Sequence, residues 1–420
     1  MNFIKKILHS FYPKLFYLIV FLIPSQLAYH FWPQYSFVYG LRIDYLSVAV
    51  YLTDILIFVY IIFFFLNNKK KRLFKKEDIL SLFVFIFFVI INIFYSKQKE
   101  TSFFKWIKIL EYLVFSFTVS KNKLLTNNKI YKTFCYSVLF FGMIGFLQVI
   151  KGSTLGGLFY FLGERSFSFV TPGISLLNIF NLSFLKPYST FSHPNSFAGY
   201  LLVVFVYLWF WKTKNNKNIY LKYLTIFFIF VLLLLTFSKG ALFSFFIILT
   251  SIFFNLLSKL KRIKYITLLI IITSVLLPII SVFLLRYKNS FSDNVSERLL
   301  LSEMSGQMLK ANFILGIGLN NFINYLPKLN TLRVPFWFLQ PVHNIFLLFT
   351  IETGLVGIGI FFLGFNKYIN YLIQNNKKVF IYILLSIFMT GFFDHYWLTL
   401  QQNMLLMFLF LGLSKNKQIK

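Results

Sequence analysis

Long apolar runs alternate with short polar segments along the whole chain. A helix that crosses a bilayer needs about 20 mainly apolar residues, and twelve segments approach that length. The predicted spans are 14–32, 46–66, 79–95, 102–120, 130–150, 196–211, 223–238, 240–257, 265–285, 343–364, 379–393 and 397–413. The pattern therefore predicts an all-α, polytopic membrane protein in which residues 1–420 form a single integral membrane domain.

Ionisable residues inside these spans are rare. Lys105, Lys108 and Glu111 recur every three residues in span 102–120, so they lie on one side of a helix. We expect this polar stripe to face protein or the membrane interface. Asp54 stands away from the ends of the second span.

The charge of the loops predicts the orientation of the chain. Alternate loops hold 27 of the 42 Lys and Arg residues, and basic loops remain in the cytoplasm. Both termini are therefore expected in the cytoplasm. A chain that is 58% hydrophobic and 13% charged is too apolar for a soluble protein of 420 residues. The formal charge of +30 is thus mainly a topology signal, and no nucleic-acid partner is expected.

Two long loops are predicted on the outer, periplasmic face. One covers 151–195, and the larger one, 286–342, separates spans 9 and 10 and contains amphipathic helices. Long ordered loops often carry function. Several scarce histidines and basic residues fall on this face: Lys186, His193, Lys239, Arg298, His343 and His395. Basic residues outside the membrane run against the charge rule, which indicates that something offsets their cost.

His343 is expected at a helix N-terminus, because Pro341 favours the start of a helix. On a regular helix, Gly354 and Gly357 would lie on the same side as His343, where two glycines let another helix pack closely. A lone histidine at an interface is more often a structural residue. The glycine face and the nearby basic groups favour a functional His343.

The other outer residues each have a structural alternative. Lys186, His193 and Asn195 precede the span at 196, where Asn195 or Ser196 can cap the helix. Lys239 lies in a tight turn, where it can extend its ammonium to the interface.

Two further outer segments remain open to interpretation. Arg298 opens an amphipathic stretch that can lie on lipid and pair with a phosphate. The neighbours Asp394 and His395 form a short turn, for which structural hydrogen bonding is favoured over catalysis.

Motifs of metal and nucleotide chemistry do not occur in the chain. There is no Walker loop and no Cys/His metal spacing, and the single Cys135 excludes a disulfide framework. The 12 acidic residues offer no outer cluster for Mg²⁺. We therefore expect a chemistry that relies on cationic side chains, without a metal or a cofactor.

Several of these motifs resemble the O-antigen ligase/polymerase superfamily. The family hallmark is His, then Asn, Ser or Gln, nine residues, Gly, two residues and Gly, which His343, Asn344, Gly354 and Gly357 match. Other blocks that look like family blocks are 40–47, 190–195, 238–240, and 297–298 followed by 316–318.

The resemblance implies an O-antigen ligase-like glycosyltransferase of the bacterial inner membrane. Its donor would be a glycan on undecaprenyl diphosphate, and its acceptor the lipid A core or another surface acceptor, joined by a metal-independent, inverting transfer on the periplasmic face. The implied site residues are His343 and Arg298 as catalytic groups, Lys186, Lys239, His193, Asn195 and Asn344 as substrate-binding groups, and Gly354 and Gly357 as structural residues. Lys186 and Lys239 stand where many members have Arg, and Lys lacks the bidentate fork for phosphate.

Other functions stay open from the sequence. A polysaccharide polymerase or a ligase to protein would use the same chemistry. A lipid-glycan flippase or transporter predicts inverted repeats and charges near the bilayer midplane, and only Asp54 fits that pattern. A non-catalytic assembly protein leaves the outer cationic residues unexplained.

Overall fold

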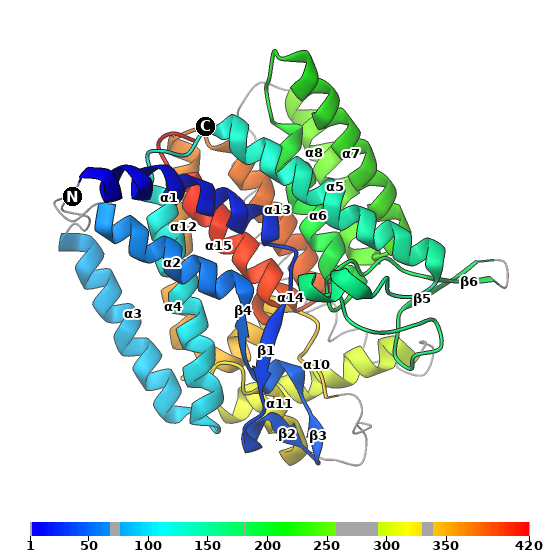
Figure 1. Cartoon of the computed structure of the whole chain (residues 1–420). Coiled ribbons are helices and arrows are strands. Elements are labelled where there is room, and N and C mark those ends of the chain that lie inside the picture. Colours follow the sequence, from blue (N-terminus) through cyan, green and yellow to red (C-terminus); the bar gives the residue numbers. More distant parts are fainter. Residues whose placement is uncertain (1, 68–75, 180–181, 258–292, 330–338, 420) are drawn as a thin grey trace.

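The chain is mostly helical in a computed structural model that describes residues 2–67, 76–179, 182–257, 293–329 and 339–419 (Figure 1). Its helices are α1 (Asn2–Leu22), α2 (Leu52–Asn67), α3 (Lys76–Tyr95), α4 (Lys99–Lys121), α5 (Asn127–Lys151), α6 (Pro194–Trp209), α7 (Asn216–Thr236), α8 (Lys239–Leu257), α10 (Asp293–Ala311), α11 (Phe322–Tyr325), α12 (Ile345–Gln374), α13 (Lys378–Phe393), α14 (Tyr396–Thr399) and α15 (Gln401–Lys415). Each predicted span except 265–285 overlaps one of these helices. That ninth span, with part of the loop 286–342, lies outside the described residues.

Three of the described helices are long and apolar enough to cross a membrane by length and composition: α5, α7 and α12. Shorter apolar helices include α2, α6 and α13. The helical bundle agrees with a membrane protein, whereas twelve crossings remain a prediction.

Short strands lie at the periphery of the bundle. They form three antiparallel pairs: β1 (Ala28–Phe31) with β4 (Val48–Tyr51), β2 (Phe37–Val38) with β3 (Leu41–Arg42), and β5 (Leu176–Ile179) with β6 (Leu182–Leu185). The expectation of an all-α chain is therefore wrong at the periphery. The spans 14–32 and 46–66 were also misplaced, because α1 already ends at Leu22, close to Pro24, and residues 28–31 and 48–51 pair as strands.

Helix α6 lies at the centre of the main hydrophobic core. Every residue from Ser196 to Leu208 is buried, and α6 packs against α7, α8, α13 and α15. An apolar helix surrounded by other helices needs no polar face. Helix α6 is therefore the central helix of the bundle, and the loop that carries His193 leads directly into it.

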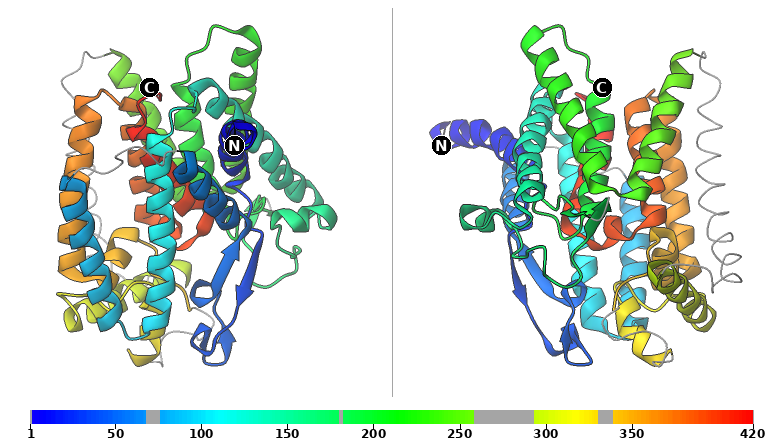
Figure 2. Two further views of the ribbon diagram at one scale, coloured as in Figure 1. Left: turned by 60° about the vertical axis from the view of Figure 1, so that its left-hand side comes forward. Right: turned by 90° about the vertical axis from the view of Figure 1, so that its right-hand side faces the viewer.

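The predicted outer segments gather at one end of the bundle. The strand pairs β1–β4 and β2–β3 lie with α10 and α11 at the end away from the C-terminus (Figures 1 and 2). Helix α10 buries Leu301, Met304 and Met308 against Leu348 and Ile351 of α12. The larger loop is thus fastened to the helix that follows it.

Helix α12 is interrupted at Gly354, whose φ of 67° and ψ of −172° are not helical. Side chains other than glycine rarely adopt such a backbone. The break frees backbone groups that bond to the segment 313–318. The four bonds run from Ile317 N to Ile351 O (2.9 Å), Gly318 N to Glu352 O (3.0 Å), Leu355 N to Phe313 O (2.9 Å) and Val356 N to Ile314 O (3.2 Å).

Asn92 of α3 completes this junction. Its amide donates to the carbonyl oxygens of Leu315 (3.2 Å) and Glu352 (3.0 Å). Its side-chain oxygen accepts from Trp106 Nε1 (2.9 Å) and from Leu319 N (3.1 Å). A buried amide with all these partners ties α3, α4 and α12 to the segment after α10.

Candidate active site

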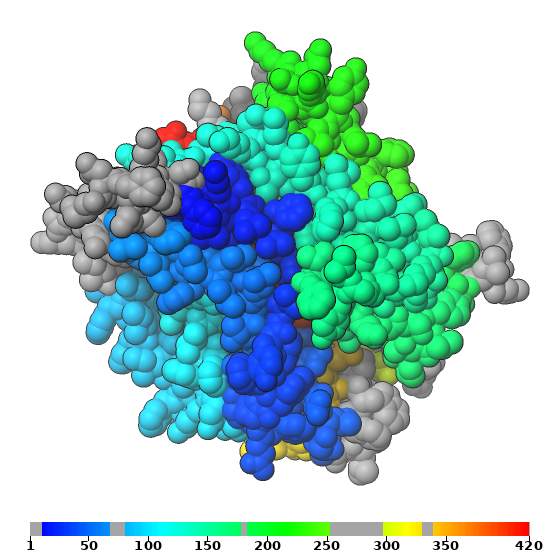
Figure 3. Space-filling model, viewed as in Figure 1, coloured from blue at the N-terminus to red at the C-terminus, as the bar shows by residue number. Residues whose placement is uncertain are grey.

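A cavity of about 1590 Å³ opens on the end of the molecule that carries the strands. Figure 3 shows this face, with a hollow between the blue strands and the green segment. Groups from distant parts of the chain line it, among them Tyr45, Arg165, His193, Asn195, Arg298, His343, Asp394 and His395. The volume exceeds the several hundred Å³ that a small ligand occupies, so the cavity has room for a large substrate.

His343 is positioned by the cap of α12. Asn344 is the N-cap, and its side-chain oxygen accepts from Phe346 N (2.9 Å) and Leu347 N (3.0 Å). His343 therefore precedes the helix instead of belonging to it. The predicted helical face shared by His343, Gly354 and Gly357 is wrong, because the helix begins after His343 and breaks at Gly354.

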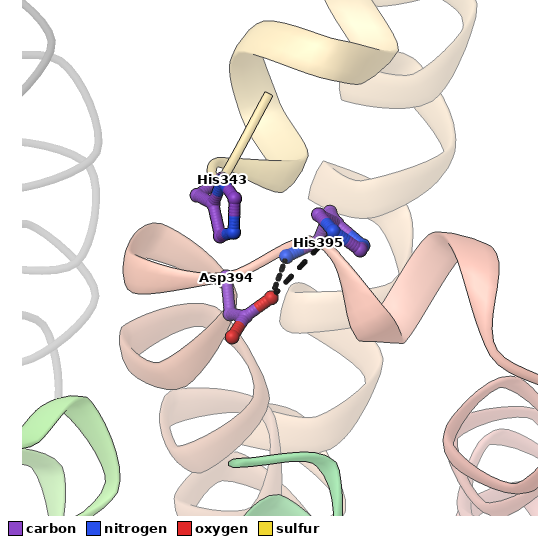
Figure 4. A group of neighbouring side chains, drawn as sticks. All are labelled: His343, Asp394 and His395. Carbon is purple, nitrogen blue, oxygen red and sulfur yellow. Dashed lines mark hydrogen bonds and ion pairs between the residues drawn. The ribbon is translucent and has the colours of Figure 1, made fainter. Parts of the chain in front are cut away.

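Asp394 and His395 lie in the turn between α13 and α14, directly beneath His343. Figure 4 shows the His343 ring pointing toward this pair. The rings of His343 and His395 have centroids 5.1 Å apart. Asp394 Oδ1 accepts from the His395 backbone N (2.8 Å), and His395 Nδ1 bonds to Thr399 Oγ1 (2.8 Å). The side chains of Asp394 and His395 are thus held by hydrogen bonds, and both residues are buried.

His193 and Asn195 reach the same cluster from α6. His193 is the N-cap, and its Nδ1 accepts from Asn195 N at 3.1 Å. The expectation that Asn195 or Ser196 caps this helix is wrong, because Pro194 occupies the first helical position and moves the cap to His193. The Asn195 amide is then free to donate to Asp394 Oδ2 (2.9 Å).

Two guanidinium groups line the cavity. Arg298 of α10 donates from Nη1 to Phe393 O (3.3 Å), next to Asp394 in sequence. Arg165 donates from Nη1 to Ser192 O (3.2 Å), next to His193. Among the described residues, each arginine makes one hydrogen bond, and a guanidinium group has further donors that suit an anion.

Burial favours the neutral form of the imidazoles. It lowers the pKa of His343 from 6.5 to about 3, against the opposing attraction of Asp394. It also lowers the pKa of His395 and that of His193. Burial alone would raise the pKa of Asp394, but the three imidazoles and the Asn195 hydrogen bond outweigh it and lower that pKa. His343 is therefore an uncharged proton acceptor beside a carboxylate.

The remaining predicted residues do not line the cavity. Lys186 and Lys239 are not among the groups that line the cavity. Burial, followed by repulsion from Lys239, lowers the pKa of Lys186, so the two ammonium groups lie within electrostatic range of each other. Gly357 faces Phe88 of α3, whose ring would lie 3.0 Å from an added Cβ. Gly357 therefore lets α12 and α3 pack closely. Asn344 is the N-cap of α12.

Sequence reasoning missed Arg165, Asp394 and His395 as members of the site. Arg165 had one detectable signal, since arginine is scarce in this lysine-rich chain and falls here in an outer loop. The adjacent pair Asp394–His395 was noticed, but a structural role was favoured because neighbouring residues in a turn rarely align for catalysis. Asp394 acquires its setting from Asn195 and His343, which come from other parts of the chain.

His343, Asp394 and His395 are also the described residues that could hold a metal ion. One ligand atom of each lies within 4.8 Å of the others, and His and Asp are common zinc ligands. The Arg298 guanidinium lines the same cavity and repels a divalent cation. The cluster therefore suits proton transfer next to an anionic group better than metal binding.

An apolar helical bundle whose end holds an imidazole, a carboxylate and guanidinium groups indicates a membrane protein with a polar, cationic cavity at one end. Residues 224–362, about a third of the chain, match the family model described as O-antigen ligase. This match confirms the O-antigen ligase/polymerase superfamily for the segment that carries Arg298 and His343. No curated protein matches the chain significantly. The family comprises ligases and polymerases of the glycosyltransferase type, and with the apolar helices it indicates a bacterial membrane protein.

Proposed function

We propose that the protein transfers a glycan from undecaprenyl diphosphate to an acceptor on the periplasmic face of the inner membrane. The acceptor would be the lipid A core or another surface acceptor. The convergence of His343, Arg298 and Asp394 on one cavity supports this proposal more than any other observation.

The acceptor hydroxyl must lose a proton as it attacks the sugar. His343 accepts that proton, since its imidazole is neutral well below pH 7. The carboxylate of Asp394 then stabilises the resulting imidazolium. Asn195 keeps the carboxylate in place through its hydrogen bond.

The bond between the sugar and the diphosphate breaks as the new glycosidic bond forms. The departing diphosphate carries the negative charge away, and Arg298 and Arg165 offer guanidinium donors to it. Lys186 and Lys239 add positive potential from outside the cavity wall. Charge stabilisation by side chains replaces a metal ion in this scheme.

The test is transfer in membranes that contain lipid-linked glycan. We expect His343→Gln to reduce transfer about 100-fold or more, because it removes the general base, while EDTA leaves the wild-type rate unchanged. His30→Gln is the matched control, because His30 also lines the cavity but bonds to Ser47 in the strand region. Undiminished transfer by His343→Gln would contradict the assigned role, and loss with EDTA would contradict the metal-free scheme.

A deletion strain distinguishes ligase from polymerase. Loss of a ligase leaves acceptor without glycan, whereas loss of a polymerase leaves acceptor that carries a single repeat unit. Surface glycan resolved on a gel separates the two outcomes, and donor trapped inside the cell would indicate a flippase instead.

A further inference from the structure

An apolar groove continues the cavity along the bundle between α2 and α4. Its lining residues are Ile55, Phe58 and Ile61 of α2 and Phe104, Ile107, Leu110 and Val114 of α4. They recur every three or four residues, so one stripe of each helix faces the groove. We refer to these seven residues as the α2/α4 groove. Phe58 is 64% exposed, Ile55 53% and Ile107 45%.

The groove lies within two predicted spans, so its open side faces lipid. From Phe104 to Val114 it follows about 15 Å of helix. An apolar channel of this kind suits a hydrocarbon chain and offers nothing to a sugar. The polar part of the cavity, with Arg298 and His343, is continuous with it.

A charged network closes one side of the groove. Lys108 bonds to Asp54 and lies 3.4 Å from Glu111 Oε2. Asp54 also accepts from Gln401 Nε2 (2.7 Å) and from Tyr51 N (2.8 Å). Lys108 is therefore neutralised by carboxylates, and its charge is not available to a ligand.

Lys105 lies one turn nearer the outer end of α4 and lines the same cavity. Among the described residues its one hydrogen bond is to the sulfur of Met404 (3.4 Å). Glu352 attracts it electrostatically but lies beyond ion-pair distance, and its carboxylate accepts from Phe322 N (3.3 Å). An ammonium group at this depth is costly unless an anion accompanies it. It also lies within electrostatic range of His395.

We infer that the α2/α4 groove holds the start of the polyprenyl chain of the donor lipid, and that Lys105 binds the phosphate to which this chain is attached. The inference rests on the proposed function, because it takes the lipid diphosphate as the donor. A cation where the apolar groove meets the polar part of the cavity matches a lipid whose anionic group follows directly on its chain. The diphosphate then extends from Lys105 toward Arg298 and His343.

Binding to the full chain in nanodiscs tests the inference without requiring transfer. The probes are undecaprenyl diphosphate and geranyl diphosphate, which share a head group and differ in chain length. Ile107→Trp fills the groove close to Lys105, where even the short geranyl chain would lie, so we expect it to weaken binding of both lipids about ten-fold or more. Ile90→Trp is the matched control, because Ile90 on α3 is also largely exposed (57%, against 45% for Ile107) but does not line the cavity.

The same probes test the lysine. Lys105→Met should weaken both lipids about ten-fold or more, since a hydrogen bond to a charged group is lost. Lys105→Arg should restore binding, and Lys99→Met, at the start of the same helix and outside the cavity lining, should leave it unchanged.

Two results would overturn the inference. Equal binding of undecaprenyl diphosphate by Ile107→Trp and wild type would exclude the groove as the site of the polyprenyl chain. Unchanged binding of both lipids by Lys105→Met would exclude Lys105 as the phosphate ligand. Both outcomes are independent of whether His343→Gln transfers glycan, so failure here and failure of the proposed function can be told apart.

Discussion

His343 owes its chemical character to its neighbours more than to its own type. Burial keeps the ring neutral, while Asp394 offers a negative charge that becomes useful only after the ring takes up a proton. In the proposed reaction, a neutral imidazole can accept the proton of the acceptor hydroxyl, and the carboxylate beside it would stabilise the positive charge that forms.

Asp394→Asn tests the role of the negative charge on Asp394. The amide keeps the size of the side chain but cannot stabilise a protonated His343, so we expect kcat to fall about 100-fold or more with little change in KM. Asp44→Asn serves as the control, because Asp44 lines the same cavity and is exposed at its wall. Steady-state kinetics that show equal losses for the two variants would argue against a specific role for Asp394.

Acid should destabilise the folded protein through His343. The unfolded chain binds a proton on this residue below pH 6.5, whereas the folded chain does so only near pH 3. Unfolding therefore takes up a proton between these values, and stability falls as the pH is lowered through them. We expect Tm in detergent to drop over this range, and His343→Gln to drop less. An unchanged slope for the variant would show that the ring is not protected from protonation.

At the scale of elements, the break in α12 replaces the regular helix that its sequence suggests. Four backbone groups next to the break at Gly354 bond to the segment 313–318. Because that segment directly follows α10, the helix that carries Arg298 is joined to the one that follows His343.

Gly354→Ala should therefore destabilise the protein by about 3 kcal/mol or more, since alanine disfavours this backbone and its Cβ would collide with Ile314 O. Gly359→Ala, on the same helix with open space around it, should be neutral or slightly stabilising. Thermal unfolding of both variants checks the difference. Equal Tm values would mean that α12 can become continuous without cost.

At the scale of the whole molecule, the charge of the loops predicts an orientation with the cavity on the periplasmic side. The single Cys135 is buried, so a Cys135→Ala background permits labelling at chosen sites. Tyr160→Cys, in the outer loop and 61% exposed, should react with an impermeant maleimide in spheroplasts. Lys214→Cys, in a basic loop, should react only after the membrane is opened. The reverse result would place the cavity on the cytoplasmic side.

Helix positions were largely predictable, because long apolar runs are a strong signal and need no knowledge of contacts. The strand pair β1–β4 was not predictable, since the two predicted spans 14–32 and 46–66 include its residues. His343 and Arg298 were recognisable from their motif, whereas Asp394 depends on a bond to Asn195, 199 residues away. Contacts of that kind arise only on folding and leave no local pattern.

The hydrogen bonds around Gly354 also limit which insertions the segment between His343 and Gly354 can accept. His343, the proposed general base, and Gly354, which fastens the arginine-bearing helix, lie eleven residues apart along one segment. An insertion between them would shift the fastening point relative to the imidazole. A chain that retains the histidine but loses this interval would need a different attachment to keep the imidazole and the guanidinium in register.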